Sequence, residues 1–200
     1  MNQAAIISRP ELILPEAEAQ RLRAAYEAAQ VILEYGSGGS TVMAAQMPGK
    51  SVFSVESDRD WAQMMRDWLA QNPPADGTVV DIIWSDLGPT EEWGYPETDR
   101  EWQRYARYPL EVWDLPEFRQ PDVVLVDGRF RAGCAMATAF RTQKPVKVFV
   151  DDYARRKHYH RIEEFLGRPA MTGRMAEFEV APMAVPADRL LTIIEMMTRP

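Results

Sequence analysis

A turn rich in glycine and serine is the part of this sequence best suited to hold a ligand. The turn reads Gly36-Ser37-Gly38-Gly39-Ser40-Thr41; residues 31–33 before it have strand preference, and residues 42–47 after it are expected to form a short helix. Glycine lets the backbone approach a ligand closely, and the unpaired N–H groups of a helix start point toward it. A strand, a glycine turn and a helix therefore predict a nucleotide site. The alternative is a structural turn, since many such turns contain three glycines.

Acidic residues at the strand ends are the second group that could do chemistry. Five successive predicted strands end at or just before Glu34, Glu56, Asp86, Asp127 and the pair Asp151-Asp152. The carboxyl ends of parallel strands share one edge of a sheet, so these carboxylates are expected to gather into a site. Glu56 lies 22 positions after Glu34, near the spacing at which an acid accepts hydrogen bonds from both ribose hydroxyls. The alternative role for Glu56 is to cap the helix that follows.

Hydrophobic periodicity and turn residues predict the elements that position these groups. Strands and helices alternate along the chain, which is typical of an α/β fold with a doubly wound, mostly parallel sheet and helices on both faces. The expected helices cover residues 15–30, 42–47, 58–71 (with Ser57 as its cap), 130–143 and 153–166. The expected strands cover residues 31–33, 51–55, 78–84, 121–126, 145–150, 176–183 and 190–197, the last two joined by a turn at 186–188.

Residues 88–120 interrupt this rhythm and form an aromatic-rich insert. There is room for one helix near residues 99–108, and a loop of this length in a compact domain is often functional. The insert is expected to help form a pocket for a small molecule. The alternative is that its aromatic side chains only cover the core. These side chains are Trp93, Tyr95, Trp102, Tyr105, Tyr108 and Trp113.

Composition limits the classes of function. The 200 residues suit one domain, and a net charge of −7 argues against a large phosphate-binding surface, so nucleic acid is not an expected partner. The single cysteine, Cys134, is expected in the core, because it falls on the apolar face of a predicted helix. Neither a signal peptide nor a membrane span is recognised, and a cytoplasmic location is expected. The two histidines, His158 and His160, are expected on a helix surface; the alternative is a proton acceptor.

The first motif resembles that of the class I S-adenosylmethionine-dependent methyltransferases. In this sequence it reads Glu34-Tyr35-Gly36-Ser37-Gly38-Gly39-Ser40, with serine at the last glycine position. A dinucleotide dehydrogenase would have GxGxxG, but Thr41 occupies the third glycine position. The resemblance covers nearly the whole chain and implies a Rossmann-like, seven-stranded sheet ending in an antiparallel hairpin.

The resemblance also implies S-adenosylmethionine as cofactor and assigns residues to it. Glu34 and the glycine turn would hold the methionine portion, Glu56 the ribose, and Asp86 would approach the adenine amino group. The full expected cofactor set is Glu34, Gly36, Ser37, Gly38, Gly39, Ser40, Thr41, Glu56, Ser57, Asp86 and Asp127.

Two later segments resemble a methyltransferase subgroup with a DG turn after strand four and DDY after strand five. These segments are VLVDGRFRAG and VFVDDYARRKHYHRIEEF. Metal-dependent catechol and caffeoyl-CoA O-methyltransferases place carboxylates at these strand ends, so Asp127, Asp151 and Asp152 are candidate ligands of an Mg²⁺-like ion. Such an ion would acidify a substrate hydroxyl. Arg129 and Arg131 depart from that pattern and could satisfy the carboxylates without a metal. Asp127 and Asp152 are the candidate catalytic residues.

The predicted function is methyl transfer from S-adenosylmethionine to a small-molecule acceptor. The alternatives are an NAD(P)-dependent oxidoreductase and a non-catalytic S-adenosylmethionine-binding member of the fold. The basic run over residues 155–161 has two explanations: Asp151 and Asp152 neutralise it, or it receives an anionic acceptor. The sequence does not predict an oligomeric state.

Overall fold

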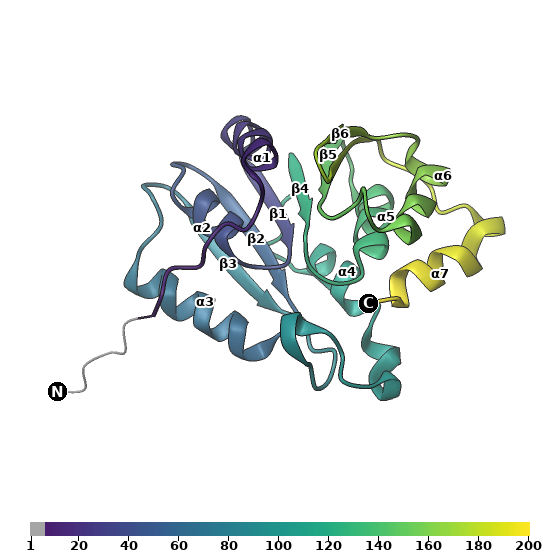
Figure 1. The fold of residues 1–200 in the computed structure, drawn as a ribbon, viewed down its shortest axis with the longest axis horizontal. Helices are drawn as coiled ribbons and strands as arrows, with labels where there is room; N and C mark the ends of the chain where they lie inside the picture. Colours follow the sequence, from purple (N-terminus) through teal and green to yellow (C-terminus); the bar gives the residue numbers. More distant parts are fainter. Residues whose placement is uncertain (1–6) are drawn as a thin grey trace.

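The computed structural model describes residues 7–200. These residues form one seven-stranded sheet in the order β3-β2-β1-β4-β5-β7-β6 (Figure 1). The first five strands are parallel, while β7 pairs antiparallel with both β5 and β6. The strands are β1 (Val31–Tyr35), β2 (Ser51–Glu56), β3 (Val79–Trp84), β4 (Val123–Val126), β5 (Val146–Val150), β6 (Ala170–Thr172) and β7 (Met175–Val180).

Helices cover both faces of the sheet, as the alternating pattern predicts. The α-helices are α1 (Glu16–Ala28), α2 (Gly39–Ala45), α3 (Arg59–Gln71), α4 (Arg107–Leu110), α5 (Arg131–Arg141), α6 (Glu163–Leu166) and α7 (Leu190–Thr198). On one face α1 packs with α2 on the middle strands, and α3 packs on α2 and β3. On the other face α5 and the insert pack on the sheet, and α7 lies outside α5 (Figure 1).

β1 lies in the middle of the sheet and is buried along its whole length. It pairs with β2 on one side and β4 on the other, so the turns that follow these strands meet at one edge. The strand order reverses beside β1, and such a switch point is where ligands bind in open α/β sheets. The predicted α/β fold class is therefore confirmed, and the glycine turn lies at its switch point.

The predicted strand over residues 190–197 is wrong, because these residues form helix α7. Leucine, isoleucine and methionine suit both structures, and the buried positions Ile193, Met196 and Met197 follow helical spacing. They pack against Met136 and Ala137 of α5. The antiparallel hairpin exists, but it joins β6 to β7 through the turn at Gly173, ahead of the predicted position.

Three other local predictions need correction. Asp58, rather than Ser57, caps α3, because its side chain accepts hydrogen bonds from the N–H groups of Asp60 and Trp61 at 2.9 Å. The predicted helix over residues 153–166 starts as a turn and continues as the 3₁₀ helix η4 (Lys157–Ile162) and α6. The insert contains α4 and three 3₁₀ helices, η1 (Glu92–Gly94), η2 (Asp99–Arg104) and η3 (Glu111–Asp114), where one helix was predicted; a fourth, η5 (Ala187–Arg189), precedes α7.

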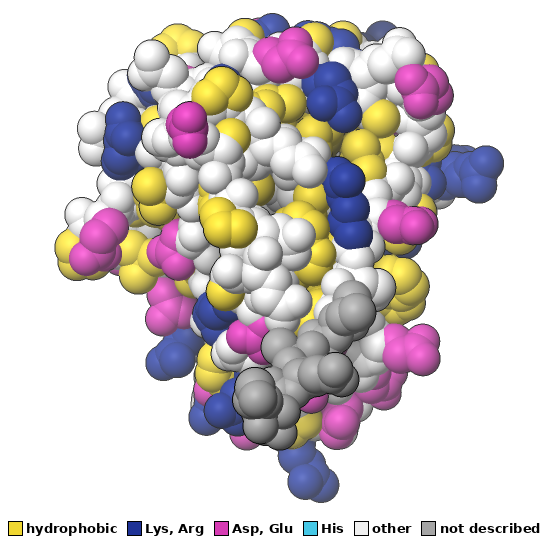
Figure 2. Space-filling view, turned by 90° about the vertical axis from the view of Figure 1, so that its left-hand side faces the viewer, with side chains coloured by type: hydrophobic (Ala, Val, Ile, Leu, Met, Phe, Trp, Pro, Cys, Tyr) yellow, Lys and Arg dark blue, Asp and Glu magenta, His cyan; other side chains and the backbone are white. Residues whose placement is uncertain are grey.

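One face of the molecule bears mixed charge. Figure 2 shows acidic and basic side chains interspersed on the face at the left of Figure 1, rather than one continuous basic field. Across residues 7–200, no helix combines the length and apolarity that crossing a bilayer requires.

Candidate active site

A cavity of about 530 Å³ opens at the carboxyl ends of β1, β2 and β4. Its walls include residues 36–40 of the glycine turn, residues 56–58 after β2, residues 127–129 after β4, and Trp93 of η1; residues 11–14, ahead of α1, close another side. A hollow of about 650 Å³ lies elsewhere, between residues 7–9 and the ends of α2 and α3, and contains none of the predicted site residues. The cavity at the strand ends is therefore the candidate site.

The glycine turn is held in place by hydrogen bonds to β2 and α3. The backbone N–H of Gly36 donates to the Val55 carbonyl at 2.8 Å, and the Ser37 hydroxyl lies 2.8 Å from that of Ser54. The indole Nε1 of Trp61 donates to the Ser37 carbonyl at 2.8 Å. The turn is thus a preorganised wall rather than a mobile connection.

Gly36 permits a close contact that no other residue could make. Its φ of +102° lies in the region that favours glycine, and a Cβ atom there would lie 2.8 Å from the backbone nitrogen of Gly128. The turns after β1 and β4 therefore touch backbone to backbone. Gly39 has a similar role against the N-terminal segment, since a Cβ atom on it would lie 2.2 Å from the backbone nitrogen of Leu12.

Glu56 presents a buried carboxylate to the cavity from the end of β2. The residue is 7% exposed, and its carboxylate oxygens accept hydrogen bonds from the backbone N–H groups of Ser37 at 3.1 Å, Ser57 at 2.6 Å and Asp58 at 2.9 Å. Burial raises the pKa of this carboxyl, and the three backbone hydrogen bonds oppose the rise. Glu56 therefore both organises the turn and faces the space where a ligand would lie.

Glu34 does not line the cavity, although it was expected to hold the methionine portion. Its carboxylate is fully buried behind the glycine turn and accepts hydrogen bonds from Tyr26 at 2.7 Å, Thr41 at 2.5 Å and Ser54 at 3.2 Å. Burial raises its pKa, against the effect of these hydroxyl donors. Thr41 is buried as well and accepts a hydrogen bond from the N–H of Gly38 at 3.0 Å. Both residues therefore stabilise the glycine turn from its buried side, away from the cavity.

Asp86 does not line the cavity either, whereas Ser57 does. The Asp86 carboxylate accepts hydrogen bonds from the Gly88 N–H and from Arg104, each at 3.0 Å, which fixes the start of the insert. The Ser57 hydroxyl donates to the Gly94 carbonyl at 2.9 Å and holds η1 beside Glu56. The adenine role expected for Asp86 is therefore not supported by its contacts.

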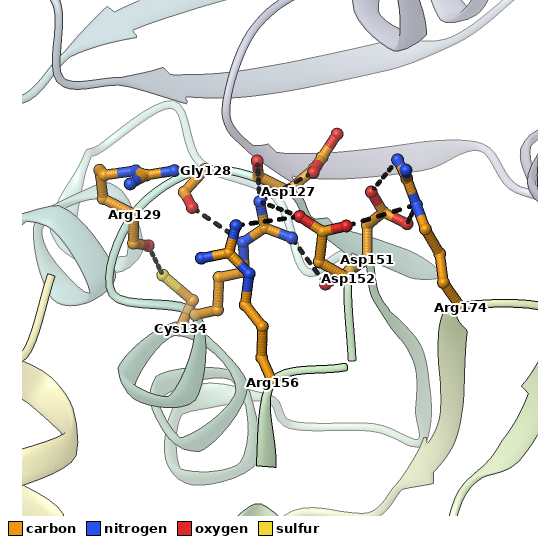
Figure 3. A network of polar contacts seen from close by, with 9 residues as sticks. Asp127, Gly128, Arg129, Cys134, Asp151, Asp152, Arg156 and Arg174 are labelled. Atoms are coloured by element: carbon orange, nitrogen blue, oxygen red, sulfur yellow. Dashed lines mark hydrogen bonds and ion pairs between the residues drawn. The ribbon is translucent and has the colours of Figure 1, made fainter. Parts of the chain in front are cut away.

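Three arginines satisfy the carboxylates that follow β4 and β5 (Figure 3). Arg174 binds both oxygens of Asp151 at 2.9 and 2.7 Å, and Arg156 lies 3.2 Å from Asp152. Arg131, only 4% exposed, lies 3.1 Å from Asp127 and 3.8 Å from Asp152. Within the described chain no group of three acidic, histidine or cysteine side chains is arranged to hold a metal ion. The donor set does not fit a metal, because guanidinium groups occupy the carboxylate oxygens.

Of these three acids only Asp127 reaches the cavity. Burial raises the pKa of its carboxyl to about 7; the Arg131 charge opposes this rise, and the neighbouring charges of Asp151 and Asp152 add to it. Asp152, which has a positive φ of +58°, points to the arginines instead. The two candidate catalytic residues therefore lie in different environments.

Arg129 differs from the neighbouring arginines. It lines the cavity, and its Nε atom is buried without a hydrogen-bond partner among residues 7–200. Its guanidinium carbon lies 5.9 Å from the ring centre of Tyr95. Figure 3 draws no contact to this guanidinium, while those of Arg156 and Arg174 meet carboxylates. The expectation that Arg129 neutralises the acids is not met.

The aromatic side chains of the insert divide into two groups. Tyr105, Tyr108 and Trp113 are buried in the core, and the Trp113 indole donates to the Tyr35 hydroxyl at 2.8 Å. By contrast, Trp93 is 76% exposed and lines the cavity. Tyr108 also reaches the cavity, where a Cβ atom on Gly128 would lie 2.1 Å from its hydroxyl. The core explanation thus holds for Tyr105 and Trp113, the pocket explanation holds for Trp93, and Tyr108 fits both. Tyr95 and Trp102 are exposed and line no part of the cavity.

The remaining candidates lie outside the cavity. Cys134 is buried on α5, as predicted. His160 stacks on Tyr153 with ring centres 4.7 Å apart, and His158 packs on Tyr159, with a pKa lowered by burial and then by Arg199, Arg156 and His160. In the basic run, Arg156 pairs with Asp152 and Arg155 is exposed. Asp152 thus neutralises Arg156 of the run, whereas Asp151 pairs with Arg174 outside it, so the predicted neutralisation holds for one of the two acids.

The sequence interpretation missed several parts of the wall. It did not assign residues 11–14 or Trp61 to the site, and it assigned Glu92 and Trp93 only as part of the whole insert. No motif marks residues 11–14, whose place depends on packing against Gly39. For Trp61 a signal was available, because a residue in the first turn of α3 lies near the ends of the strands. Trp61 also fits the apolar face of that helix, and the sequence interpretation assigned it there.

The fold and the site can now be compared with known proteins. No protein-family profile and no curated protein matches the chain. A methyltransferase-like protein from Silicibacter pomeroyi is 60% identical, with a TM-score of 0.94 over 96% of this chain and 99% of that one. An O-methyltransferase from Streptomyces achromogenes in complex with S-adenosylmethionine is 16% identical, with a TM-score of 0.55 over 87% of this chain and 82% of that one.

A third similar structure is an O-methyltransferase from Bacillus cereus in complex with S-adenosylhomocysteine. It is 13% identical, with a TM-score of 0.54 over 83% of this chain and 82% of that one. At such identities the second and third structures show the shared fold, while the first shows kinship along almost the full chain. The chain therefore belongs to the same family as this methyltransferase-like protein and has the fold of the class I S-adenosylmethionine-dependent methyltransferases.

Proposed function

We propose that this protein transfers a methyl group from S-adenosylmethionine to a small-molecule acceptor. The observation that carries the proposal is the contact between Glu56 and the glycine turn, which places a buried carboxylate and a close-packed backbone turn on one cavity. A carboxylate suits ribose hydroxyls, and the turn leaves room for a thin, extended group such as methionine. The cavity thus fits the cofactor that the family uses.

The proposed roles of the residues follow from their positions. Glu56, with Ser57 beside it, accepts hydrogen bonds from the ribose hydroxyls. Residues 36–40 contact the methionine portion. Glu34 and Thr41 hold the turn rather than the cofactor. Asp127 completes the wall beside Gly128. Each role rests on a side chain or backbone that is already fixed by contacts within the protein.

S-adenosylmethionine supplies a methyl group on a sulfonium, which a nucleophile can displace in line. The protein contributes mainly by aligning the acceptor and excluding water, an effect that can supply up to about 7–11 kcal/mol. Asp127 is our candidate proton acceptor, because it lines the cavity and its pKa is about 7. Asp152 is assigned a positioning role through Arg131, and no metal step is proposed.

The insert is proposed to contribute to the acceptor pocket through Glu92 and Trp93, with the buried Tyr108 as part of the cavity wall. Glu92 and Trp93 line the cavity and are exposed, so they can contact a second molecule beside the cofactor. An exposed indole on a cavity rim is an apolar surface suited to a small organic acceptor. Apart from Tyr108, the buried part of the insert has a structural role.

Calorimetry with S-adenosylhomocysteine, NAD and NADP tests the class of function. Binding of S-adenosylhomocysteine alone supports the proposal, and binding of a nicotinamide cofactor alone contradicts it. Incubation of the protein with labelled S-adenosylmethionine and a metabolite extract then separates an enzyme from a non-catalytic binder. Labelled product is expected with and without EDTA, because arginines occupy the carboxylates that a metal would need.

A further inference from the structure

We propose that Arg129 binds the carboxylate of the methionine portion of S-adenosylmethionine. The inference rests on the proposed function and adds a residue to it. Arg129 follows the turn after β4 that touches the glycine turn, so it lies at the end of the cavity assigned to methionine. A guanidinium forms two parallel hydrogen bonds with a carboxylate, which gives both affinity and orientation.

The first argument is the contrast between Arg129 and the arginines around it. Arg131, Arg156 and Arg174 each pair with an acidic side chain, whereas no ion pair involves Arg129 anywhere in residues 7–200. Its Nε atom is also buried and lacks a partner. Buried donors are nearly always satisfied in proteins, so an orphaned one in a cavity wall points to an acceptor that arrives with a ligand.

The second argument is the charge of the cavity wall. Its acidic members are Glu11, Glu56, Asp58, Glu92 and Asp127, and Arg129 is its one basic member in the described part of the chain. The methionine portion of S-adenosylmethionine carries two positive centres, the ammonium and the sulfonium, and one carboxylate. The acids suit the positive centres, but they would repel the carboxylate. Arg129 is the side chain that can balance it.

The third argument is that the backbone around Arg129 is fixed. The Cys134 thiol donates to the Arg129 carbonyl at 3.4 Å, and the next residue, Phe130, is fully buried with a positive φ of +50°. The guanidinium itself rests near the ring of Tyr95. Arginine held in this way loses little conformational freedom on binding, which favours a specific anion site over a solvated surface charge.

A carboxylate could also come from the acceptor instead of the cofactor, and the experiment separates these sources. Calorimetry would compare S-adenosylhomocysteine with its decarboxylated analogue, which keeps the ammonium and lacks the carboxylate. Each compound would be titrated into the wild type, Arg129→Met and Arg129→Lys. The matched control is Arg59→Met, since Arg59 also lies over an aromatic ring, that of Trp84, but does not line the cavity.

Arg129→Met is expected to lower the affinity for S-adenosylhomocysteine roughly 10- to 100-fold. The affinity for the decarboxylated analogue should stay within about threefold of the wild-type value. Arg129→Lys should recover part of the loss, and Arg59→Met should bind both compounds normally. Unchanged binding of S-adenosylhomocysteine to Arg129→Met overturns the inference and leaves an acceptor carboxylate as the partner. An equal loss of affinity for both compounds overturns the inference as well.

Two further outcomes keep the test decisive. If Arg129→Met does not fold, as judged by thermal melting, Arg129→Lys takes its place: a loss of affinity confined to S-adenosylhomocysteine supports the inference, and unchanged affinity for S-adenosylhomocysteine, or equal affinity of the wild type for the two compounds, overturns it. If neither compound binds the wild type, the proposed function fails, and that result is distinct from a failure of the Arg129 assignment.

Discussion

The Glu56 carboxylate accepts a hydrogen bond from the Ser37 N–H at 3.1 Å and so joins the end of β2 to the glycine turn after β1. The same carboxylate binds the N–H groups of Ser57 and Asp58 ahead of α3. One side chain therefore fixes two walls of the cavity. Its replacement should change ligand affinity through both the lost acceptor and the loosened turn.

Glu56→Gln is expected to weaken the binding of S-adenosylhomocysteine by roughly 1.5–3 kcal/mol, because the charged group that accepts hydrogen bonds from the ribose is lost. Calorimetry measures the change, and Glu92→Gln serves as the control for removing a negative charge from the same cavity. If both variants lose affinity equally, the effect is general electrostatics, and the ribose assignment is wrong.

Asp86→Asn is expected to bind S-adenosylhomocysteine with nearly wild-type affinity. The Asp86 carboxylate contacts Gly88 and Arg104 and does not line the cavity. Removing the Asp86 charge should instead lower the free energy of unfolding by about 1 kcal/mol or less, because the ion pair with Arg104 is half-exposed. Denaturant unfolding measures this change. A large loss of affinity with unchanged stability would restore the adenine role predicted from the sequence.

Gly36→Ala is expected to lower the free energy of unfolding by roughly 1–3 kcal/mol from the positive φ alone. The new Cβ atom would also lie 2.8 Å from the Gly128 nitrogen, which adds to the loss. Gly38→Ala is the matched control, because a Cβ atom at that position meets nothing within 4 Å. Equal stability of the two variants in urea unfolding would show that the turns do not pack as described.

Asp127→Asn should change how stability depends on pH. The carboxyl of Asp127 has a folded pKa of about 7, above the value of about 3.9 in an unfolded chain. The folded state therefore binds more protons between these values, so this group's contribution to stability is present below pH 4 and is lost as pH rises through 7.

Melting curves of both proteins from pH 4 to pH 8 measure this effect. The asparagine variant lacks this titration, so its melting temperature relative to the wild type should rise across the window and level off above it. Buried Glu34 and Glu56 also have raised pKa values, but they are common to both proteins and cancel in the difference. A constant difference at every pH would mean that the Asp127 carboxyl titrates as in an unfolded chain.

Hydrogen exchange should divide the insert into two parts. Residues 105–113 contain the buried Tyr105, Tyr108 and Trp113, so their amides should exchange slowly with or without S-adenosylhomocysteine. Glu92 and Trp93 line the cavity, and their amide exchange should slow when the compound binds. Slowing across the entire insert would instead indicate that it closes as one lid.

Local sequence patterns were sufficient for the framework of the fold. The five parallel strands are apolar runs bounded by turn residues, and the glycine turn and Glu56 occupy the positions predicted for them. The turn residues and the period of the apolar side chains carry this information, because both act over a few neighbouring residues. The class of fold, and the edge of the sheet at which the candidate cavity opens, could therefore be predicted from the sequence.

Tertiary packing decided what local patterns left open. Residues 190–197 suit a strand or a helix, and the surface of α5 selects the helix by burying Ile193, Met196 and Met197. Neighbouring side chains in a strand point to opposite faces, so Glu34, one residue before the end of β1, enters the core beside Tyr26.

The partners of the acids were also decided by tertiary structure. Asp86 meets Arg104, and Asp151 meets Arg174, across 18 and 23 residues of chain, while Arg129 meets no acid within residues 7–200. The sequence by itself determined that carboxylates and arginines gather at the strand ends. Only the folded chain decided which of them neutralise each other and which face the cavity, because pairing depends on distances between segments that the sequence does not contain.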